Sequence, residues 1–337
     1  IFFQKVLESP TEINQLKGQK IMVEFSSPNT NKPLHLGHMR NHALGLALSN
    51  TLKKAGAEVI RTTIFNDRGV HICKSMLAYK YFGEDKTPES EEKKSDHFVG
   101  DYYVKFEEAQ KEKPTLMEEA QQMLLDWEEG NEEVKSLWKT MNDWAFEGYA
   151  KTYARQGLTF DKKYYESDLY KTGKEYVLEG FEKGILKKTD DGAIYLDMEE
   201  IGLDKKVLLR SNGTTVYMTQ DLGTTVLKQK DFNPDQQIWV VADEQNYHFK
   251  VLFFALEKLG LLSAKNLFHL GYGLVHLPDG RMKSREGNVV DADNLMDDLH
   301  EIATQKIKEQ NAELSDEIIY KIAEQIQNAS WKFYLLK

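Results

Sequence analysis

The chain has 337 residues, of which 41% are hydrophobic and 11% aromatic. This composition excludes a disordered tail and a fibrous repeat, and the length predicts two to three compact units. Acidic residues outnumber basic residues by 54 to 44, and the net charge of −10 excludes nonspecific attraction to a polyanion as the main activity.

Cys73 is the single cysteine of the sequence. One thiol cannot form an internal disulfide framework or a zinc site built from several thiolates, and it fits a reducing compartment. No apolar run reaches the roughly 18 residues that span a bilayer, and the first residues lack a basic region followed by a cleavage site. We therefore expect a cytoplasmic protein with no membrane partner. Because the chain starts at Ile1 and stops at Lys337 within a helical pattern, we also expect a fragment of a longer protein.

The first 80 residues predict a βαβ unit. Residues 20–25 form a short apolar run that is typical of a buried strand, and a turn-rich stretch follows at 26–33. From His38 onward, leucines recur at every fourth position until Gly56, which stands where a glycine ends a helix. Residues 59–65 are β-branched and predict a second strand. Strand, helix and strand in this order imply a parallel sheet.

An acidic stretch follows. Between Glu84 and Glu133 there are seventeen acidic and six basic residues, and tryptophans are spaced along this part and beyond it. This pattern predicts helices with solvated outer faces. We interpret them as an insertion into the sheet domain at about residues 84–165.

Two hairpin-like pairs come next. Residues 185–188 and 193–196 flank an Asp-Gly turn and predict a second insertion at about 185–200. Residues 207–210 and 215–218 predict a further pair of strands around a Ser-Asn-Gly turn.

The rest of the chain returns to sheet architecture and then becomes helical. Residues 238–242 predict a strand, His248 to Leu259 a helix ended by a glycine, and residues 267–270 another strand. After Asp293 the apolar spacing is helical to the end. The predicted fold class is α/β, with a Rossmann-like parallel sheet, helical and hairpin insertions, and the start of an all-α domain.

The most informative tetrapeptide is His35-Leu36-Gly37-His38, which lies where a strand ends and a helix begins. Free N–H groups and the helix dipole favour a phosphate at such a place, and Gly37 leaves the backbone open to a flat ring. A pair of surface histidines remains an alternative, as does a metal site with His42 as the third ligand. The preceding loop and Lys32 favour an anion over a metal.

The surrounding residues make the tetrapeptide more specific. EFSSPN at residues 24–29 and KPLHLGHMR at residues 32–40 closely resemble the HIGH motif of class I aminoacyl-tRNA synthetases, and in detail the arginyl-tRNA synthetases. Further matches follow in the same order at residues 217–221, 245–248 and 282–290. The chain is therefore similar to this family over about residues 20–337.

The resemblance implies a domain division. Residues 1–19 would be a linker from an N-terminal domain outside this chain. Residues 20–290 would form the class I catalytic domain with both insertions. Residues 291–337 would start the helical anticodon-binding domain.

The resemblance also implies the reaction: ATP-dependent activation of L-arginine to arginyl-adenylate, followed by transfer to tRNA(Arg). In this family's pattern, His35, His38 and Lys32 carry the catalysis at the ATP phosphates, and Gly37 lies near the adenine. The chemistry is electrostatic, without a covalent enzyme intermediate. Mg²⁺ is expected to arrive with ATP, no protein metal site is expected, and the protein is expected to be a monomer.

The second signature motif departs from the usual KMSKS sequence. The segment RMKSR at residues 281–285 has serine where the fourth residue would be lysine. The resemblance implies that Lys32 supplies the missing ammonium. The other ATP-binding residues that it implies are Met282, Lys283, Ser284, Arg285 and, less directly, His248.

Arginine recognition requires carboxylates, because a planar guanidinium is best matched by a bidentate acceptor. The resemblance assigns this role to Glu24 and Asp221, with Tyr217 packed beside them. From the residues alone, Asp221 could equally be a charge near a helix N-terminus and Tyr217 a core aromatic. The resemblance assigns the α-amino and carboxylate groups of arginine to Ser27, Asn29 and Gln245.

Two alternatives remain at this stage. A non-catalytic paralogue would bind arginine or nucleotide without turnover, but it would be expected to lose the histidines that are present here. Another nucleotidyltransferase of the same superfamily would explain His35 and His38 but not the arginine-type residues. Asp67 and Gly69 also match family positions, and the sequence assigns them no role.

Overall fold

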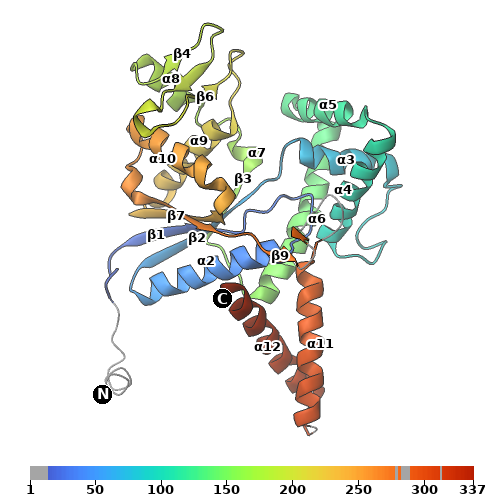
Figure 1. The fold of residues 1–337 in the computed structure, drawn as a ribbon. Coiled ribbons are helices and arrows are strands. Elements are labelled where there is room, and N and C mark those ends of the chain that lie inside the picture. Colours follow the sequence, from blue (N-terminus) through green and yellow to red (C-terminus); the bar gives the residue numbers. More distant parts are fainter. Residues whose placement is uncertain (1–13, 278–279, 282–288, 312) are drawn as a thin grey trace. The chain divides into compact units, whose positions relative to one another are not determined.

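The computed structural model describes residues 14–277, 280–281, 289–311 and 313–337 (Figure 1). The chain forms two compact units. Unit 1 contains the described residues up to 25 together with 47–63 and 160–273, and unit 2 contains 26–46, 64–159 and the part from 274 onward. In the described part of the chain, no helix combines the length and apolarity needed to cross a membrane.

A five-stranded sheet with the order β3-β2-β1-β7-β8 organises unit 1. Its strands are β1 (Lys20–Glu24), β2 (Glu58–Phe65), β3 (Lys162–Tyr165), β7 (Gln236–Ala242) and β8 (Leu267–Tyr272). β1 pairs in parallel with β2 and with β7, and β7 pairs in parallel with β8. Ile21, Met22 and Val23 of the central strand are at most 1% exposed, as expected for a strand that is covered on both faces. The predicted Rossmann-like parallel sheet is confirmed.

Helices and a small sheet complete unit 1. They are α7 (Glu166–Leu169), α8 (Lys174–Glu182), α9 (Tyr217–Phe232), α10 (Asn246–Lys258), the short turns η1 (Glu199–Ile201), η2 (Asp243–Gln245) and η3 (Ala264–Asn266), and the strands β4 (Lys187–Lys188), β5 (Ile194–Leu196) and β6 (Lys206–Leu209). β4 and β5 form the predicted antiparallel hairpin, and β6 adds to β5 as a third strand. The predicted strand at 215–218 is confirmed only as one antiparallel bridge between Leu209 and Thr215, because Tyr217 and Met218 are the first residues of α9.

Unit 2 is mainly helical. Its helices are α3 (Val70–Phe82), α4 (Ser95–Glu112), α5 (Leu116–Glu129), α6 (Glu132–Gln156), α11 (Ala292–Gln310) and α12 (Asp316–Leu336), and β9 (His276–Leu277) pairs with β10 (Gly280–Arg281). α2 (Leu36–Lys54) contributes residues to both units. The acidic stretch forms α4, α5 and the start of α6, as predicted. The predicted insertion to about residue 165 extends too far, because β3 belongs to the five-stranded sheet.

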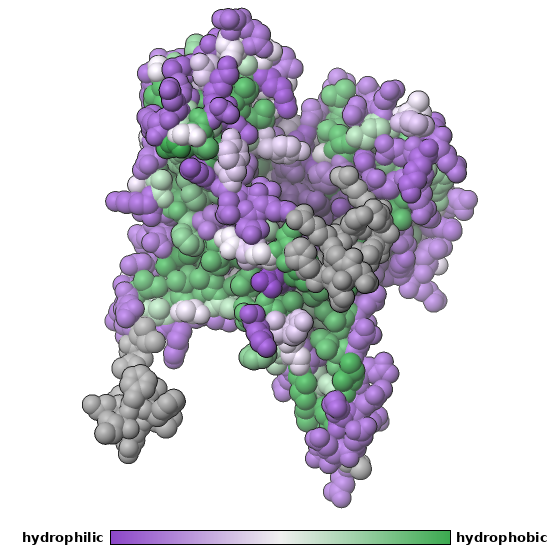
Figure 2. Space-filling view, in the orientation of Figure 1, coloured by the Kyte–Doolittle hydropathy of each residue, from purple (hydrophilic) through white to green (hydrophobic). Residues whose placement is uncertain are grey.

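α11 and α12 confirm that the end of the chain is helical, and they pack against each other (Figure 1). Side-chain oxygens cap both helices: Asp291 accepts from the N–H groups of Asp293 and Asn294, and Ser315 accepts from that of Ile318. The core between the two helices is small, and apolar residues of the pair also lie on the surface (Figure 2). The exposed apolar side chains of the pair include Ile302, Ile318, Ile326 and Phe333.

Candidate functional site

A loop with an unusual backbone connects β1 to α2. Ser26 and Ser27 have φ values of 77° and 48°, a left-handed conformation that residues other than glycine seldom adopt. The N–H of Ser26 donates to Oδ1 of Asn41 over 2.5 Å, and Nδ2 of Asn66 donates to the carbonyl of Ser27 over 3.2 Å. This strained backbone lies in the loop that carries Ser27 and Asn29, which we expect to bind arginine. Strained backbone conformations cluster at binding and active sites.

The second half of the loop rests on α6. Asn29 forms a parallel bridge with Asn66. The hydroxyl of Tyr149 lies 2.8 Å from the carbonyl of Asn29 and 2.5 Å from that of Lys32. Because Tyr149 is fully buried, these contacts fix the loop backbone to the interior of unit 2.

His35 and His38, the two histidines of the HIGH-like motif, lie close together at the start of α2, with ring centroids 3.9 Å apart and ring planes tilted by 42°. The N–H of His35 donates to Nδ1 of His38, and the N–H of Gly37 donates to Nδ1 of His35, each over 3.1 Å. A neutral imidazole that accepts at Nδ1 carries its proton on Nε2. Both rings therefore offer an Nε2–H donor that suits a phosphate oxygen.

Electrostatics keep this pair neutral. Burial, followed by the charge of Lys32, lowers the pKa of His35 to about 4. Burial and the neighbouring His35, His42 and Lys32 hold the pKa of His38 well below its usual range. His42 cannot serve as the third ligand of a metal site with His35 and His38, because its Nε2 and Nδ1 atoms already contact Ser26 and Gln156.

The first motif is also joined to the segment that follows the second motif. The N–H of Leu36 donates to the carbonyl of Val290 over 2.9 Å, and the N–H of Ala292 donates to that of Leu34 over 3.0 Å. A cavity of about 210 Å³ lies beside this junction. Its lining includes Lys32, His35, Lys93, His97, Tyr103 and Asp291. The Lys32 ammonium lies 4.7 Å from the Tyr103 ring centroid. Lys32 and His35, two of the three predicted phosphate residues, thus border this cavity.

One group of possible metal ligands occurs among the described residues, formed by Asp96, His97 and Asp293. The ammonium of Lys94 lies 2.9 Å from a carboxylate oxygen of Asp96 and 2.7 Å from one of Asp293. The Lys94 ammonium already balances the charge of these carboxylates and occupies the place between them. The group is therefore an ion-pair cluster and does not fit a metal ion. Sequence spacing could not reveal this cluster, because Asp293 is 199 positions away from Lys94.

In unit 1, the arginine-type residues lie on α9 and α10. Nε2 of His248 donates to Oδ2 of Asp221 over 2.6 Å. Tyr217 lies one turn before Asp221 on α9 and is 71% exposed, so it is not a core aromatic. Gln245 ends η2 and is exposed. The carboxylate of Asp221 is only partly buried and is therefore accessible to a cation.

Glu24 has a partner that the sequence did not reveal. It ends β1, and its carboxylate contacts the ammonium of Lys228, which is 3% exposed. Lys228 follows Asp221 by seven residues on α9, a rise of about 10 Å. We expected Glu24 and Asp221 to offer two free carboxylates side by side. The structure differs, because the carboxylate of Glu24 is paired with Lys228. A guanidinium at Glu24 would have to share that carboxylate with Lys228.

Asp67 and Gly69, to which the sequence assigned no role, support the local structure. The carbonyl of Asp67 accepts from the indole of Trp138 over 2.6 Å and from Nδ2 of Asn142 over 3.3 Å. Gly69 precedes α3 with a φ of 114°, a conformation that favours glycine. The predicted ATP-binding residues Met282, Lys283, Ser284 and Arg285 lie outside the described residues.

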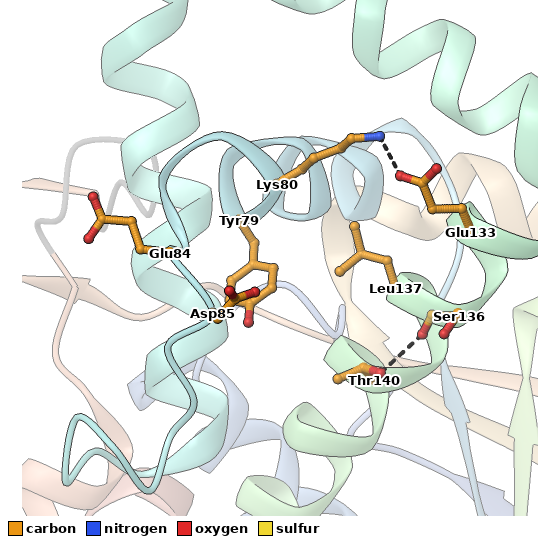
Figure 3. Close-up of a pocket in the computed structure, with 8 residues that line it drawn as sticks. All are labelled: Tyr79, Lys80, Glu84, Asp85, Glu133, Ser136, Leu137 and Thr140. Atoms are coloured by element: carbon orange, nitrogen blue, oxygen red, sulfur yellow. Dashed lines mark hydrogen bonds and ion pairs between the residues drawn. The ribbon is translucent and has the colours of Figure 1, made fainter.

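A second cavity, of about 580 Å³, lies between α3, the loop after it and α6 (Figure 3). Acidic side chains and Lys80 border it, and Lys80 is paired with Glu133 over 2.6 Å. None of the predicted site residues lines this cavity.

Comparisons with known proteins agree with the sequence motifs. The family described as tRNA synthetases class I (R), catalytic domain, matches residues 3–336. An arginine–tRNA ligase of Treponema denticola is 54% identical over 335 residues, which are 99% of this chain and 57% of the relative. An arginine–tRNA ligase of Borrelia hermsii is 50% identical over 331 residues, with 96% of this chain and 56% of the relative covered. The chain thus spans a little over half the length of these relatives.

Solved structures show the same fold. The arginyl-tRNA synthetase of Thermus thermophilus superimposes with a TM-score of 0.81 at 22% identity, covering 95% of this chain and 58% of that one. The enzyme of Plasmodium falciparum has a TM-score of 0.73 at 18% identity, covering 97% and 54%.

Proposed function

Because the chain belongs to the class I arginyl-tRNA synthetases, we propose that it carries the catalytic core of an arginine–tRNA ligase. It binds ATP and L-arginine and forms arginyl-adenylate, and the whole protein transfers the arginyl group to tRNA(Arg). The observation that supports this most is the pair of adjacent, neutral imidazoles with Nε2–H donors at the start of α2.

The first step is an in-line displacement at phosphorus. A carboxylate oxygen of arginine attacks the α-phosphate of ATP, the bond to the bridging oxygen breaks, and pyrophosphate leaves. Negative charge grows on the phosphate oxygens in the transition state, where preorganised donors act most strongly. His35 and His38 supply N–H donors, Lys32 supplies an ammonium, and Gly37 leaves room for the adenine.

Arginine selection is assigned mainly to Asp221. Its partly exposed carboxylate is a bidentate acceptor for a guanidinium, and Tyr217 offers a ring face one turn away. Lys228 already balances the charge of Glu24, so Glu24 contributes less than Asp221. The α-amino and carboxylate groups of arginine are assigned to Ser27, Asn29 and Gln245.

The remaining partners follow from the substrate chemistry. Mg²⁺ enters with ATP and is held mainly through the phosphates. His248 supports the site through its hydrogen bond to Asp221, and residues 282–285 complete the ATP site. The protein acts in the cytoplasm as a monomer.

ATP binding is expected to take up protons. In the free protein, burial keeps the pKa of His35 at about 4, so the ring is neutral near neutral pH. A bound polyphosphate favours the charged ring and raises that pKa. Affinity for ATP should therefore rise as pH falls through the pKa of the complex. Calorimetry at about pH 6 in two buffers of different ionisation enthalpy measures the uptake, and its persistence in His35→Gln would contradict this assignment.

Asp221→Asn is expected to weaken arginine binding at least tenfold, because a hydrogen bond to a charged group contributes about 1.5–3 kcal/mol. ATP affinity should change by less than about twofold, since the substitution lies outside the first motif. Calorimetric titration of each ligand measures both values. Asp168→Asn, which changes a carboxylate on α7 in the same way, is the matched control. Equal arginine affinity in Asp221→Asn and the control would remove Asp221 from the pocket.

The proposed function is tested by thermal-shift titration with each amino acid, with and without ATP. We expect stabilisation by arginine and not by the other amino acids. ATP–pyrophosphate exchange with tRNA(Arg) added then separates an enzyme from a binding-only paralogue. We expect this chain to bind both substrates but to charge tRNA poorly. Stabilisation by a different amino acid would refute the arginine assignment.

A further inference from the structure

Two buried side chains contact the hydroxyl of Ser26, the first residue of the strained loop, and a third contacts one of these two. Oγ of Ser26 lies 2.7 Å from Nε2 of His42 and 2.7 Å from the hydroxyl of Tyr153. Nδ1 of His42 lies 2.7 Å from Oε1 of Gln156. His42 and Gln156 are 0% exposed, and Ser26 and Tyr153 are at most 6% exposed. His42 belongs to the helix that carries the first motif, whereas Tyr153 and Gln156 come from the last turn of α6.

Each hydrogen bond in this group has a fixed direction. Oε1 of Gln156 is only an acceptor, so Nδ1 of His42 carries the proton. Nε2 of the neutral ring is then an acceptor, and the hydroxyl of Ser26 donates to it. Oγ of Ser26 in turn accepts from the hydroxyl of Tyr153. The proton positions thus run in one direction, from Tyr153 through Ser26 and His42 to Gln156.

The surroundings of His42 keep its ring neutral. Burial lowers the pKa of His42 to about 4, although the hydrogen bond to Gln156 opposes this effect. The neighbouring titratable groups are His35 and His38 from its own helix and Tyr153 from α6. From α12, the ammonium of Lys332 donates to the backbone carbonyl of Gln156 over 2.7 Å. None of these groups carries a negative charge that would stabilise the protonated ring.

This network explains how the loop keeps its backbone conformation. Non-glycine residues in the left-handed region persist only where the surroundings over-determine them. Ser26 is held at its N–H by Asn41 and at its hydroxyl by His42 and Tyr153. We propose that His42 is a positioning residue for arginine binding: it fixes Ser26 in the left-handed conformation and thereby places Ser27 and Asn29. The proposal rests on the proposed function, in which these two residues bind arginine.

The test uses glycine, which adopts positive φ without strain. His42→Ala is expected to raise the arginine Kd about tenfold and the ATP Kd less than twofold, because the strained conformation is no longer favoured. In a Ser26→Gly background, the loop no longer needs this support, so adding His42→Ala should change the arginine Kd by less than about threefold. A tenfold effect in both backgrounds would mean that His42 acts in another way, and would overturn the proposal.

Two controls separate positioning from a general loss of structure. His300→Ala removes a histidine on α11 whose Nδ1 lies 2.9 Å from Glu324, and it should leave both affinities unchanged. Histidine ring ¹⁵N spectra of the unaltered protein should show the proton of His42 on Nδ1 near neutral pH. A proton on Nε2, or a charged ring, would overturn the hydrogen-bond directions. If the unaltered chain does not bind arginine, the proposed function fails and this role with it. If the chain binds arginine but the His42 variant binds equally well, only the positioning role fails.

Discussion

His38→Ala is expected to slow adenylate formation about 10²–10³-fold, the usual loss when one preorganised donor to a developing oxyanion is removed. The Nε2–H of His38 is such a donor, because the backbone N–H of His35 occupies Nδ1 and burial disfavours the charged ring. The ATP Kd should change much less than the rate, since the donor acts most strongly as charge grows on the phosphate. ATP–pyrophosphate exchange with tRNA(Arg) present measures the rate, and calorimetry measures the Kd.

The control for this substitution is Thr51→Ala, an exposed position on the same helix, which should leave the rate unchanged. Because the chain spans a little over half the length of its relatives, the same pair of substitutions is also measured in the whole protein. Circular dichroism and thermal melting check that the fold is retained. An exchange rate within about threefold of the unaltered protein would show that His38 does not act on the phosphate.

Lys228→Met is expected to lower the free energy of unfolding by about 3–5 kcal/mol, the typical cost of leaving one member of a buried ion pair without its partner. Lys228 is 3% exposed and its ammonium contacts the carboxylate of Glu24, which is 8% exposed. The ammonium also lies over the rings of Tyr164 and Trp239. Methionine can fill this apolar space, so the loss comes from the isolated carboxylate. Urea titration measures it.

Two further variants identify the cause of that loss. Lys230→Met changes an exposed lysine of the same helix and should cost less than about 1 kcal/mol. Adding Glu24→Gln to Lys228→Met removes the uncompensated charge and should restore most of the stability. An equal loss in both lysine variants would show that the buried pair is not the cause.

The parts of the fold that were predicted correctly have strong local signals. The strands β1 and β2 and the intervening α2 follow from an apolar run, leucines at every fourth position and a β-branched run, and the parallel pairing confirms them. The β7-α10-β8 unit follows in the same way. In each case the local spacing and the final packing favour the same structure.

The errors lie where local signals are weak or misleading. Thr215 and Val216 favour a strand, but the chain enters α9 at Tyr217, where packing overrides local propensity. β3 was placed in the helical insertion because its sequence, KKYY, has no apolar run. It lies at the end of the strand order, and an edge strand tolerates charged residues that a central strand does not.

The sequence proposes residues for the candidate site, but it does not reveal the side chains with which they pair. The motifs indicate His35, His38, Glu24 and Asp221. The residues around Lys228 give no indication that this lysine on α9 is buried, since lysine is normally exposed. The histidine tautomers depend on backbone N–H groups whose direction only the fold defines. Gln156, the partner of His42 at Nδ1, lies 114 positions further along the chain, a pairing that no local spacing can reveal.

The backbone bridge between His35 and Asp291 joins two residues that are 256 positions apart, and Lys94 reaches Asp293 across 199 positions. Contacts this distant in sequence form late in folding, because the intervening chain must first be ordered. During synthesis the first motif leaves the ribosome long before Val290 and Ala292, whose backbone groups bond to Leu36 and Leu34. A nascent chain that stops short of α11 can therefore build the parallel sheet but lacks the support behind its histidines. The proposed nucleotide site is therefore complete only once the segment at Val290 and Ala292 has been synthesised.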